Sequence, residues 1–172
     1  INFKINPSYY QSLIREIIKA GNAYGQSELG KNKTANVEFV SANPTGPLTV
    51  GHGRNAVLGD TVANILENHG YKVTREYYFN DAGRQMRILG DSVEARYREI
   101  VDGSSVFPED GYQGEYIRDI ARKIQEEHGN NIKKGHSVFH KSAENDIFDE
   151  IKKSLKNLGI HHNKFSNEKT FY

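Results

Sequence analysis

Thr49 and His52 lie three residues apart, where a glycine- and proline-containing loop leads into a long helix. Gly51, between them, allows a ligand to approach the backbone closely. The free N–H groups and the dipole at a helix start stabilise an anion such as a phosphate. Fixed donors here would stabilise the charge that builds up during phosphoryl or nucleotidyl transfer. The alternative is a tight glycine connection in which His52 only caps the helix, since a four-residue motif also occurs by chance.

The apolar pattern around this loop predicts alternating strands and helices. Alternating or short apolar runs predict strands, and apolar residues at steps of three and four predict helices. We expect strands over 37–40 and 71–79, a helix over 53–69 with apolar positions Val57, Leu58, Val62 and Ile65, and a helix over 86–100. This order indicates an α/β fold, a Rossmann-like parallel sheet with flanking helices. Ligands bind beyond the carboxyl ends of such strands, where the loop over 41–52 lies.

The rest of the chain is expected to extend this domain. Asn6 and Pro7 predict a helix start, and the apolar positions after them are expected to face a core: Tyr10, Leu13, Ile14, Ile17 and Ile18. We divide the chain into a helical lead-in over 1–32, the first part of the catalytic domain over 33–101, an insertion over 102–141, and a return helix with the start of a further strand over 142–172. Without an initial methionine and with an end inside that strand, the chain is expected to be a fragment of a larger protein.

Composition argues against several classes of protein. The 172 residues carry 23 basic and 22 acidic side chains, a net charge of +1, which argues against a chain-wide attraction to nucleic acid. The absence of cysteine excludes disulfides and thiolate metal sites. There is neither a signal peptide nor an apolar run near the roughly 20 residues of a membrane span. We expect a cytoplasmic protein without membrane contact. His136 and His140 lack an acidic cluster beside them, so no metal site is predicted.

Three segments carry a resemblance to a known family. The stretch VEFVSANPTGPLTVGHGRNAVLGD over 37–60 resembles the signature of class I aminoacyl-tRNA synthetases, and within them of arginyl-tRNA synthetases. YYFNDAGRQM over 77–86 and GYQGEYI over 111–117 support it. The resemblance implies activation of arginine by ATP, with Mg²⁺ accompanying the phosphates, and transfer of the arginyl group to tRNA(Arg). It also implies a lysine-rich second signature beyond Tyr172, so we expect this chain alone to be inactive. We expect the complete protein to be a monomer.

The resemblance implies two groups of site residues. Glu38, Ser41 and Asn43 match positions that line the arginine pocket, although Glu38 could also face solvent on an alternating strand. A carboxylate is the natural partner of a guanidinium. The matching ATP-binding positions are Pro47, Leu48, Thr49, Gly51, His52, Gly53 and Asn55. Asp81 and Gln85 match a further motif near the site, with a helix N-cap and a surface amide as their alternatives.

Thr49 departs from the family signature, which usually has histidine at this position. A hydroxyl can donate to a phosphate but carries no charge. We predict that Thr49 and His52 are the catalytic pair. Related nucleotidylyltransferases commonly have threonine here, so a plain adenylyltransferase is one alternative. A fragment that binds nucleotide or tRNA without chemistry is another.

Overall fold

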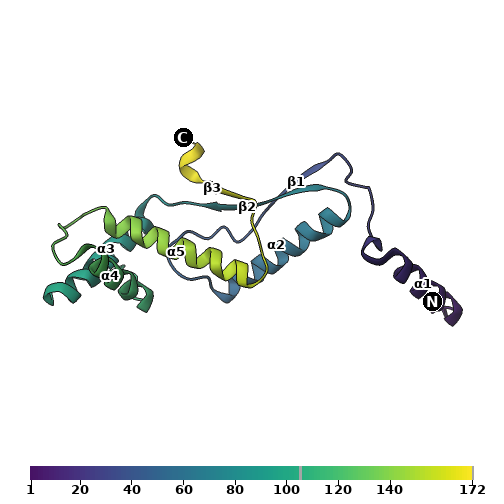
Figure 1. The fold of residues 1–172 in the computed structure, drawn as a ribbon, viewed down its shortest axis with the longest axis horizontal. Helices are drawn as coiled ribbons and strands as arrows, with labels where there is room; N and C mark the ends of the chain where they lie inside the picture. Colours follow the sequence, from purple (N-terminus) through teal and green to yellow (C-terminus); the bar gives the residue numbers. More distant parts are fainter. Residues whose placement is uncertain (105, 172) are drawn as a thin grey trace.

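In the computed structural model, which describes residues 1–104 and 106–171, three parallel strands form a sheet (Figure 1). They are β1 (Thr34–Glu38), β2 (Lys72–Phe79) and β3 (Lys164–Asn167), in the order β1-β2-β3. Glu38 lies opposite Glu76, and Glu76 lies opposite Lys164. Parallel neighbours must be joined by crossover connections. Helices supply these connections here, which confirms the predicted α/β class.

Helix α2 (Val50–Asn68) joins β1 to β2 and packs on the sheet through small residues. Its buried residues are Ala56, Gly59 and Ala63. A Cβ atom on Gly59 would lie 2.2 Å from Cγ of Phe39, so the close approach of helix and sheet requires glycine. The bulky apolar residues lie on the other side and are 41–65% exposed: Val57, Leu58, Val62 and Ile65. The predicted helix is confirmed, but the apolar pattern does not mark its buried face.

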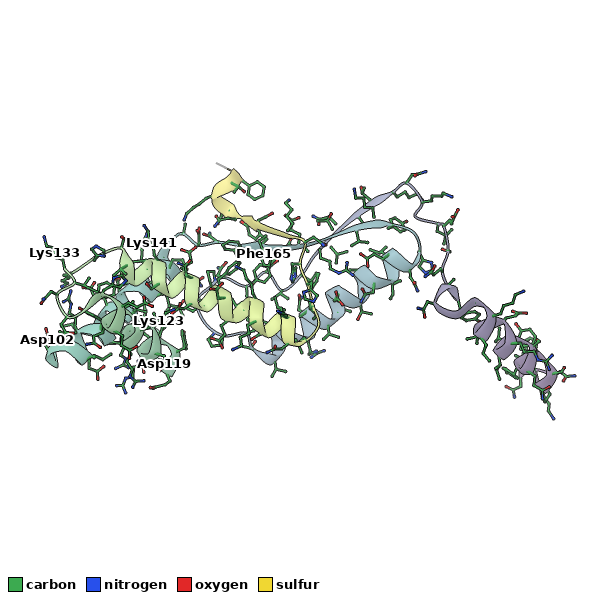
Figure 2. All side chains as sticks on the ribbon, in the orientation of Figure 1. Asp102, Asp119, Lys123, Lys133, Lys141 and Phe165 are labelled. Atoms are coloured by element: carbon green, nitrogen blue, oxygen red, sulfur yellow. The ribbon has the colours of Figure 1, made fainter. Side chains whose placement is uncertain are left out.

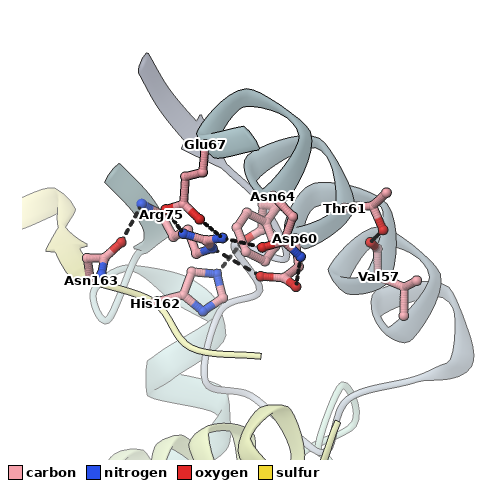
Figure 3. Close-up of polar contacts among 9 residues, drawn as sticks. Val57, Asp60, Thr61, Asn64, Glu67, Arg75, His162 and Asn163 are labelled. Carbon is pink, nitrogen blue, oxygen red and sulfur yellow. Dashed lines mark hydrogen bonds and ion pairs between the residues drawn. The ribbon is translucent and has the colours of Figure 1, made fainter. Parts of the chain in front are cut away.

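Arg75 of β2 ties α2 to the sheet (Figure 3). Its guanidinium lies 3.0 Å from Asp60 and 2.6 Å from Glu67, and it donates to Asn64 at 2.6 Å. Its backbone N–H donates to Asn163, just before β3, at 2.9 Å. The hydrogen bond with Glu67 raises the pKa of Arg75 and lowers that of Glu67. Every charge in this cluster is paired, so its role is to join elements.

Most of the hydrophobic core lies among three helices that pack on one another: α3 (Arg84–Asp102), α4 (Glu115–His128) and α5 (Val138–Asn157). The core residues include Leu89, Val93, Tyr97, Ile117, Ile124, Phe139, Ile147 and Ile151. Helix α4 falls within the expected insertion over 102–141, yet its buried residues belong to the same core. The boundaries of that insertion stay a prediction.

Aromatic rings connect the helical core to the sheet. Phe148 of α5 lies 4.6 Å from Phe79 of β2 and 5.6 Å from Phe165 of β3, measured between ring centroids. Figure 2 shows Phe165 between β3 and α5. In Figure 1 both α2 and α5 lie on the same side of the sheet. The opposite face of the sheet carries no α-helix from the described residues. On it Glu76 and Ser166 are buried, the ring of Phe171 lies 6.3 Å from that of Tyr78, and Glu38 is exposed.

Helix α1 (Pro7–Ala20) begins as predicted but does not face a core. The Asn6 side chain accepts the backbone N–H of Ser8 at 3.0 Å, and Pro7 follows it. No residue of α1 is buried. The expected core positions Tyr10, Ile14, Ile17 and Ile18 are 40–75% exposed, and Leu13 is half-exposed. After a short 3₁₀ turn, η1 (Gly21–Ala23), the chain returns to the sheet, and α1 projects away from it (Figures 1 and 2). An amphipathic pattern shows that a face is apolar, not what covers it.

Among the described residues, no helix is long and apolar enough to cross a membrane.

Two predicted strands differ from the observed ones at their ends. The first was expected over 37–40, but β1 ends at Glu38 because Val40 and Ser41 have positive φ angles of 67° and 44°. In the expected C-terminal strand only four residues are extended, and β3 is followed by a 3₁₀ turn, η2 (Glu168–Phe171). The last residue of that expected strand, Tyr172, lies outside the described residues.

Candidate functional site

A strained turn follows β1 at the carboxyl edge of the sheet. The N–H of Ser41 donates to the carbonyl of Phe39 at 3.0 Å, which closes a three-residue turn around Val40. Val40 has φ 67°, and a positive φ at the centre of such a γ-turn is rare and strained. For a β-branched residue it is an outlier that costs about 1–3 kcal/mol. Such strain persists only where neighbouring groups hold it.

Three neighbouring groups hold this turn. Asn55 Oδ1 on α2 accepts the N–H of Val40 at 2.6 Å. His162 Nε2 donates to the carbonyl of Phe39 at 3.3 Å. Burial lowers the pKa of His162. Ser41 Oγ accepts the backbone N–H of Tyr78 on β2 at 3.1 Å. The turn is therefore fastened to α2, to the segment before β3, and to the central strand.

The three predicted arginine-binding residues lie side by side along β2. Glu38 lies opposite Glu76 in the register of β1 and β2. Ser41 Oγ accepts the N–H of Tyr78, and Asn43 Oδ1 accepts the N–H of Asn80 at 2.9 Å. The N–H groups of alternate residues in a strand point toward the same neighbour, so Ser41 and Asn43 continue along β2 on the side where β1 ends. The structure thus brings together residues that the sequence places on a strand and on a loop.

Glu38 and Glu76 are neighbours with opposite bonding states. Glu76 is buried and accepts hydrogen bonds from Asn36 at 2.5 Å, from Lys164 at 2.8 Å and from Ser166. These bonds, that of Lys164 first, lower the pKa of Glu76 to about 2. Glu38 is exposed, and its side chain has no hydrogen bond or ion pair to any residue in the described part of the chain. Of this pair, only Glu38 is open to bind a cationic ligand.

The loop after the turn is also fixed by side chains. The hydroxyl of Tyr77 donates to the carbonyl of Ala42 at 2.8 Å, and the hydroxyl of Tyr116 on α4 donates to that of Thr45 at 2.9 Å. Asn43 Nδ2 donates to Gln85 Oε1 at 3.1 Å. Gln85 is exposed, so it remains a surface amide that contacts a predicted site residue. Sequence reasoning missed Tyr77 and Tyr116 as site residues, because nothing local marks a tyrosine whose hydroxyl reaches a distant backbone carbonyl.

Thr49 and His52 meet at the start of α2. Thr49 is the N-cap residue, and its backbone N–H donates to His52 Nδ1 at 3.0 Å. The Thr49 hydroxyl lies 3.2 Å from the same nitrogen. Because Nδ1 accepts, the ring proton is on Nε2, which is left as a donor. The helix cap is thus real, and it also orients an imidazole N–H at the end of α2 that favours anions.

The other predicted ATP-binding residues line the same helix start. Pro47 and Gly51 are exposed, and Leu48 packs against the core. A Cβ atom on Gly53 would meet nothing within 4 Å, so there is open space beside it. Asn55 instead points back to the turn at Val40.

Asp81 lies just after β2 in a cluster that joins three elements. Its side chain is 8% exposed, and Oδ2 accepts from Lys169 of η2 at 2.8 Å. Burial alone would raise the pKa of Asp81, but hydrogen bonds from Lys169 and Asn167 bring it below its usual value. Burial and the nearness of Asp81 raise the pKa of Glu144 on α5. Asp81 Oδ1 is buried and has no hydrogen-bond partner among the described residues. Asp81 is not the N-cap of α3, a position that Gly83 occupies.

Comparison with known proteins agrees with this geometry. Residues 13–169 match the family described as tRNA synthetases class I (R), catalytic domain. The chain is 53% identical to an arginine–tRNA ligase of Chlorobium phaeobacteroides and 48% identical to one of Desulfotalea psychrophila. Each match covers 100% of this chain and 32% of the relative. The chain thus spans about a third of the length of these curated relatives.

Solved structures show the same fold. A Campylobacter jejuni protein described as a candidate arginyl-tRNA synthetase superimposes with a TM-score of 0.84 at 32% identity, over 98% of this chain and 38% of that one. Thermus thermophilus arginyl-tRNA synthetase gives a TM-score of 0.54 at 21% identity, over 97% of this chain and 28% of that one, which supports the fold alone. With the match over residues 13–169, these likenesses show that the chain belongs to the family of class I (R) tRNA synthetase catalytic domains.

Proposed function

We propose that the complete protein activates L-arginine with ATP and transfers the arginyl group to tRNA(Arg), as a monomer in the cytoplasm. The observation that carries this proposal is the open carboxylate of Glu38 beside the satisfied Glu76. A guanidinium matches a carboxylate bidentately, so Glu38 suits the side chain of arginine. The relatives at 53% and 48% identity, which are named arginine–tRNA ligases, support the choice of amino acid.

The proposed chemistry uses both ends of the site. With its guanidinium at Glu38 and its polar groups near Ser41 and Asn43, arginine presents its carboxylate to the α-phosphorus of ATP. A bond forms between the carboxylate oxygen and that phosphorus, and pyrophosphate leaves. The Nε2–H of His52, the hydroxyl of Thr49 and the first N–H groups of α2 stabilise the charge on the phosphoryl oxygens. Mg²⁺ is expected to accompany the phosphates of ATP.

Specificity would follow from the charge of Glu38. A neutral amino acid in the pocket would leave this carboxylate without a partner, and such a loss is unfavourable once the site is closed to water. Arginine is therefore expected to be preferred over citrulline, which has the same shape without the charge.

Pyrophosphate exchange tests the proposal on the complete protein. The assay is run with and without tRNA(Arg). We expect exchange of pyrophosphate into ATP to depend on arginine and to be weak with lysine or citrulline. Exchange without any amino acid would favour an adenylyltransferase instead. Nucleotide or tRNA binding with no exchange under either condition would favour a binding module. Size-exclusion chromatography with light scattering tests the monomer.

A further inference from the structure

Asn55 was expected to bind ATP, but its side chain faces the strained turn. Its Oδ1 accepts the N–H of Val40 at 2.6 Å, at the centre of the turn between Phe39 and Ser41. We infer that Asn55 is a positioning residue for arginine: it holds this turn, and through the turn it places Glu38 and Ser41. The inference rests on the proposed function, because it concerns the amino-acid end of the same site.

The turn needs support because its backbone is unfavourable for its residues. Val40 and Ser41 have φ angles of 67° and 44°, which glycine adopts freely and a β-branched residue avoids. The bond from Val40 to Asn55 is the hydrogen bond that fixes the strained residue itself. The bonds to Phe39 and Ser41 fix only its neighbours. Without Asn55, the N–H of Val40 loses its partner, and relaxation toward negative φ becomes favourable.

A change in the backbone conformation of Val40 would move the proposed arginine-binding residues on either side of it. Glu38 lies two residues before it, at the end of β1, and Ser41 follows it. A rotation at Val40 moves Ser41 away from the N–H of Tyr78, to which its Oγ bonds at 3.1 Å. Asn55 lies on the same helix as His52, three residues further on. Asn55 thus links the helix start proposed for ATP to the strand end proposed for arginine.

Three variants of the complete protein test this role in pyrophosphate exchange. Asn55→Ala is expected to raise the KM for arginine about 10-fold and to leave the KM for ATP within about twofold. Val40→Gly adopts the positive φ without strain, so adding it to Asn55→Ala is expected to recover at least half of the loss. The matched control is Asn145→Ala on α5, which is exposed and has no side-chain hydrogen bond within the described residues. It is expected to behave as the wild type.

Two kinetic results would overturn the inference. A higher KM for ATP with an unchanged KM for arginine would make Asn55 a nucleotide ligand. Unchanged values for both substrates would mean that the turn does not depend on it.

Amide hydrogen exchange separates this inference from the proposed function, because it needs no activity. Asn55→Ala is expected to speed exchange at the Val40 amide about 10-fold relative to Asn145→Ala, since the amide loses its acceptor. Unchanged protection at Val40 would refute the role of Asn55 whatever the enzyme activates. If the wild-type protein shows no arginine-dependent pyrophosphate exchange, the proposed function is wrong. The hydrogen-exchange protection of the Val40 amide would still show whether Asn55 holds the turn.

Discussion

Two glutamates in register show how neighbouring carboxylates take different roles. The carboxylate of Glu76 accepts hydrogen bonds from three side chains of the sheet, so it is not available to a ligand. Glu38 lies directly opposite Glu76 on the edge strand β1. No side chain among the described residues donates a hydrogen bond to its carboxylate. An open carboxylate beside a satisfied one leaves a single negative charge for a cationic ligand.

Glu38→Gln tests this selectivity. Glutamine keeps the size of the side chain and removes the charge, so the KM for arginine is expected to rise about 10- to 100-fold, the equivalent of one or two charge-assisted hydrogen bonds. The KM for ATP should change little. The matched control is Glu126→Gln on the exposed side of α4. Equal increases for arginine and ATP would mean that Glu38 supports the fold.

His52→Ala tests the donor at the start of α2. Loss of an oriented donor to the reacting phosphoryl group is expected to slow arginyl-adenylate formation about 10²- to 10³-fold, as measured by single-turnover kinetics. The same change removes the cap on Thr49 and should cost about 1 kcal/mol of stability. His161→Ala, at an exposed site beyond α5, is the control. An unchanged rate with lowered stability would leave His52 as a cap only.

The distance along the chain separates the contacts in the candidate site that the sequence predicts from those that it does not. Thr49 and His52 are three residues apart, so the sequence alone predicts that they lie together at a helix start, although Thr49 and not His52 is the N-cap. Asn55 and Val40 are 15 residues apart, and Gln85 and Asn43 are 42 apart. Only the packing of α2 and α3 on the sheet brings such pairs together. The contacts of Asn55 and Gln85 therefore required the structure.

At the scale of elements, small residues decide how α2 sits on the sheet. Gly59 faces Phe39 so closely that even a methyl group would overlap its ring. The sequence pattern gave the bulky residues of α2 most weight, yet they are the exposed ones. Propensity and periodicity predict where a helix lies, whereas the face it buries depends on the shape of its neighbour.

Gly59→Ala and Gly53→Ala form a matched pair on α2. The new Cβ at residue 59 would lie 2.2 Å from Phe39, so overpacking should cost about 1–3 kcal/mol and lower the thermal midpoint. The new Cβ at residue 53 meets open space, so alanine should be neutral or stabilise by up to about 1 kcal/mol through helix propensity. Circular dichroism melts check both. Equal midpoints would contradict the packing described for α2.

Glu76 makes the sheet sensitive to acid. Its folded pKa of about 2 is below its ordinary value of 4.5, so its contribution to stability is present above pH 4.5 and is lost between there and about pH 2. That contribution is of the order of 3 kcal/mol. Denaturant unfolding between pH 2 and 6 should therefore show a steeper loss of stability for the wild type than for Glu76→Gln, with Glu126→Gln behaving as the wild type. Parallel curves for all three proteins would contradict the role assigned to Glu76.

At the scale of the molecule, the predicted and observed architectures agree in class and differ in how the surface is covered. The strand and helix order predicts the parallel sheet correctly, because each step is local. The exposed face of α1 and the bulky side of α2 are apolar surfaces that no described residue covers. Large apolar patches of this kind drive association in water.

Self-association of the isolated 172-residue chain is the consequence we expect from these surfaces. Ile14, Ile17 and Ile18 are 55%, 40% and 75% exposed, so sedimentation equilibrium should show oligomers whose mass rises with concentration. Ile14→Lys with Ile18→Lys places two like charges on this face and should shift the chain toward monomer without loss of helix content, because neither residue packs against the core. Arg15→Lys, which keeps its charge, controls for substitution on the same helix. A chain that stays monomeric at high concentration, or a double variant that associates as strongly as the wild type, would show that the apolar face of α1 is covered.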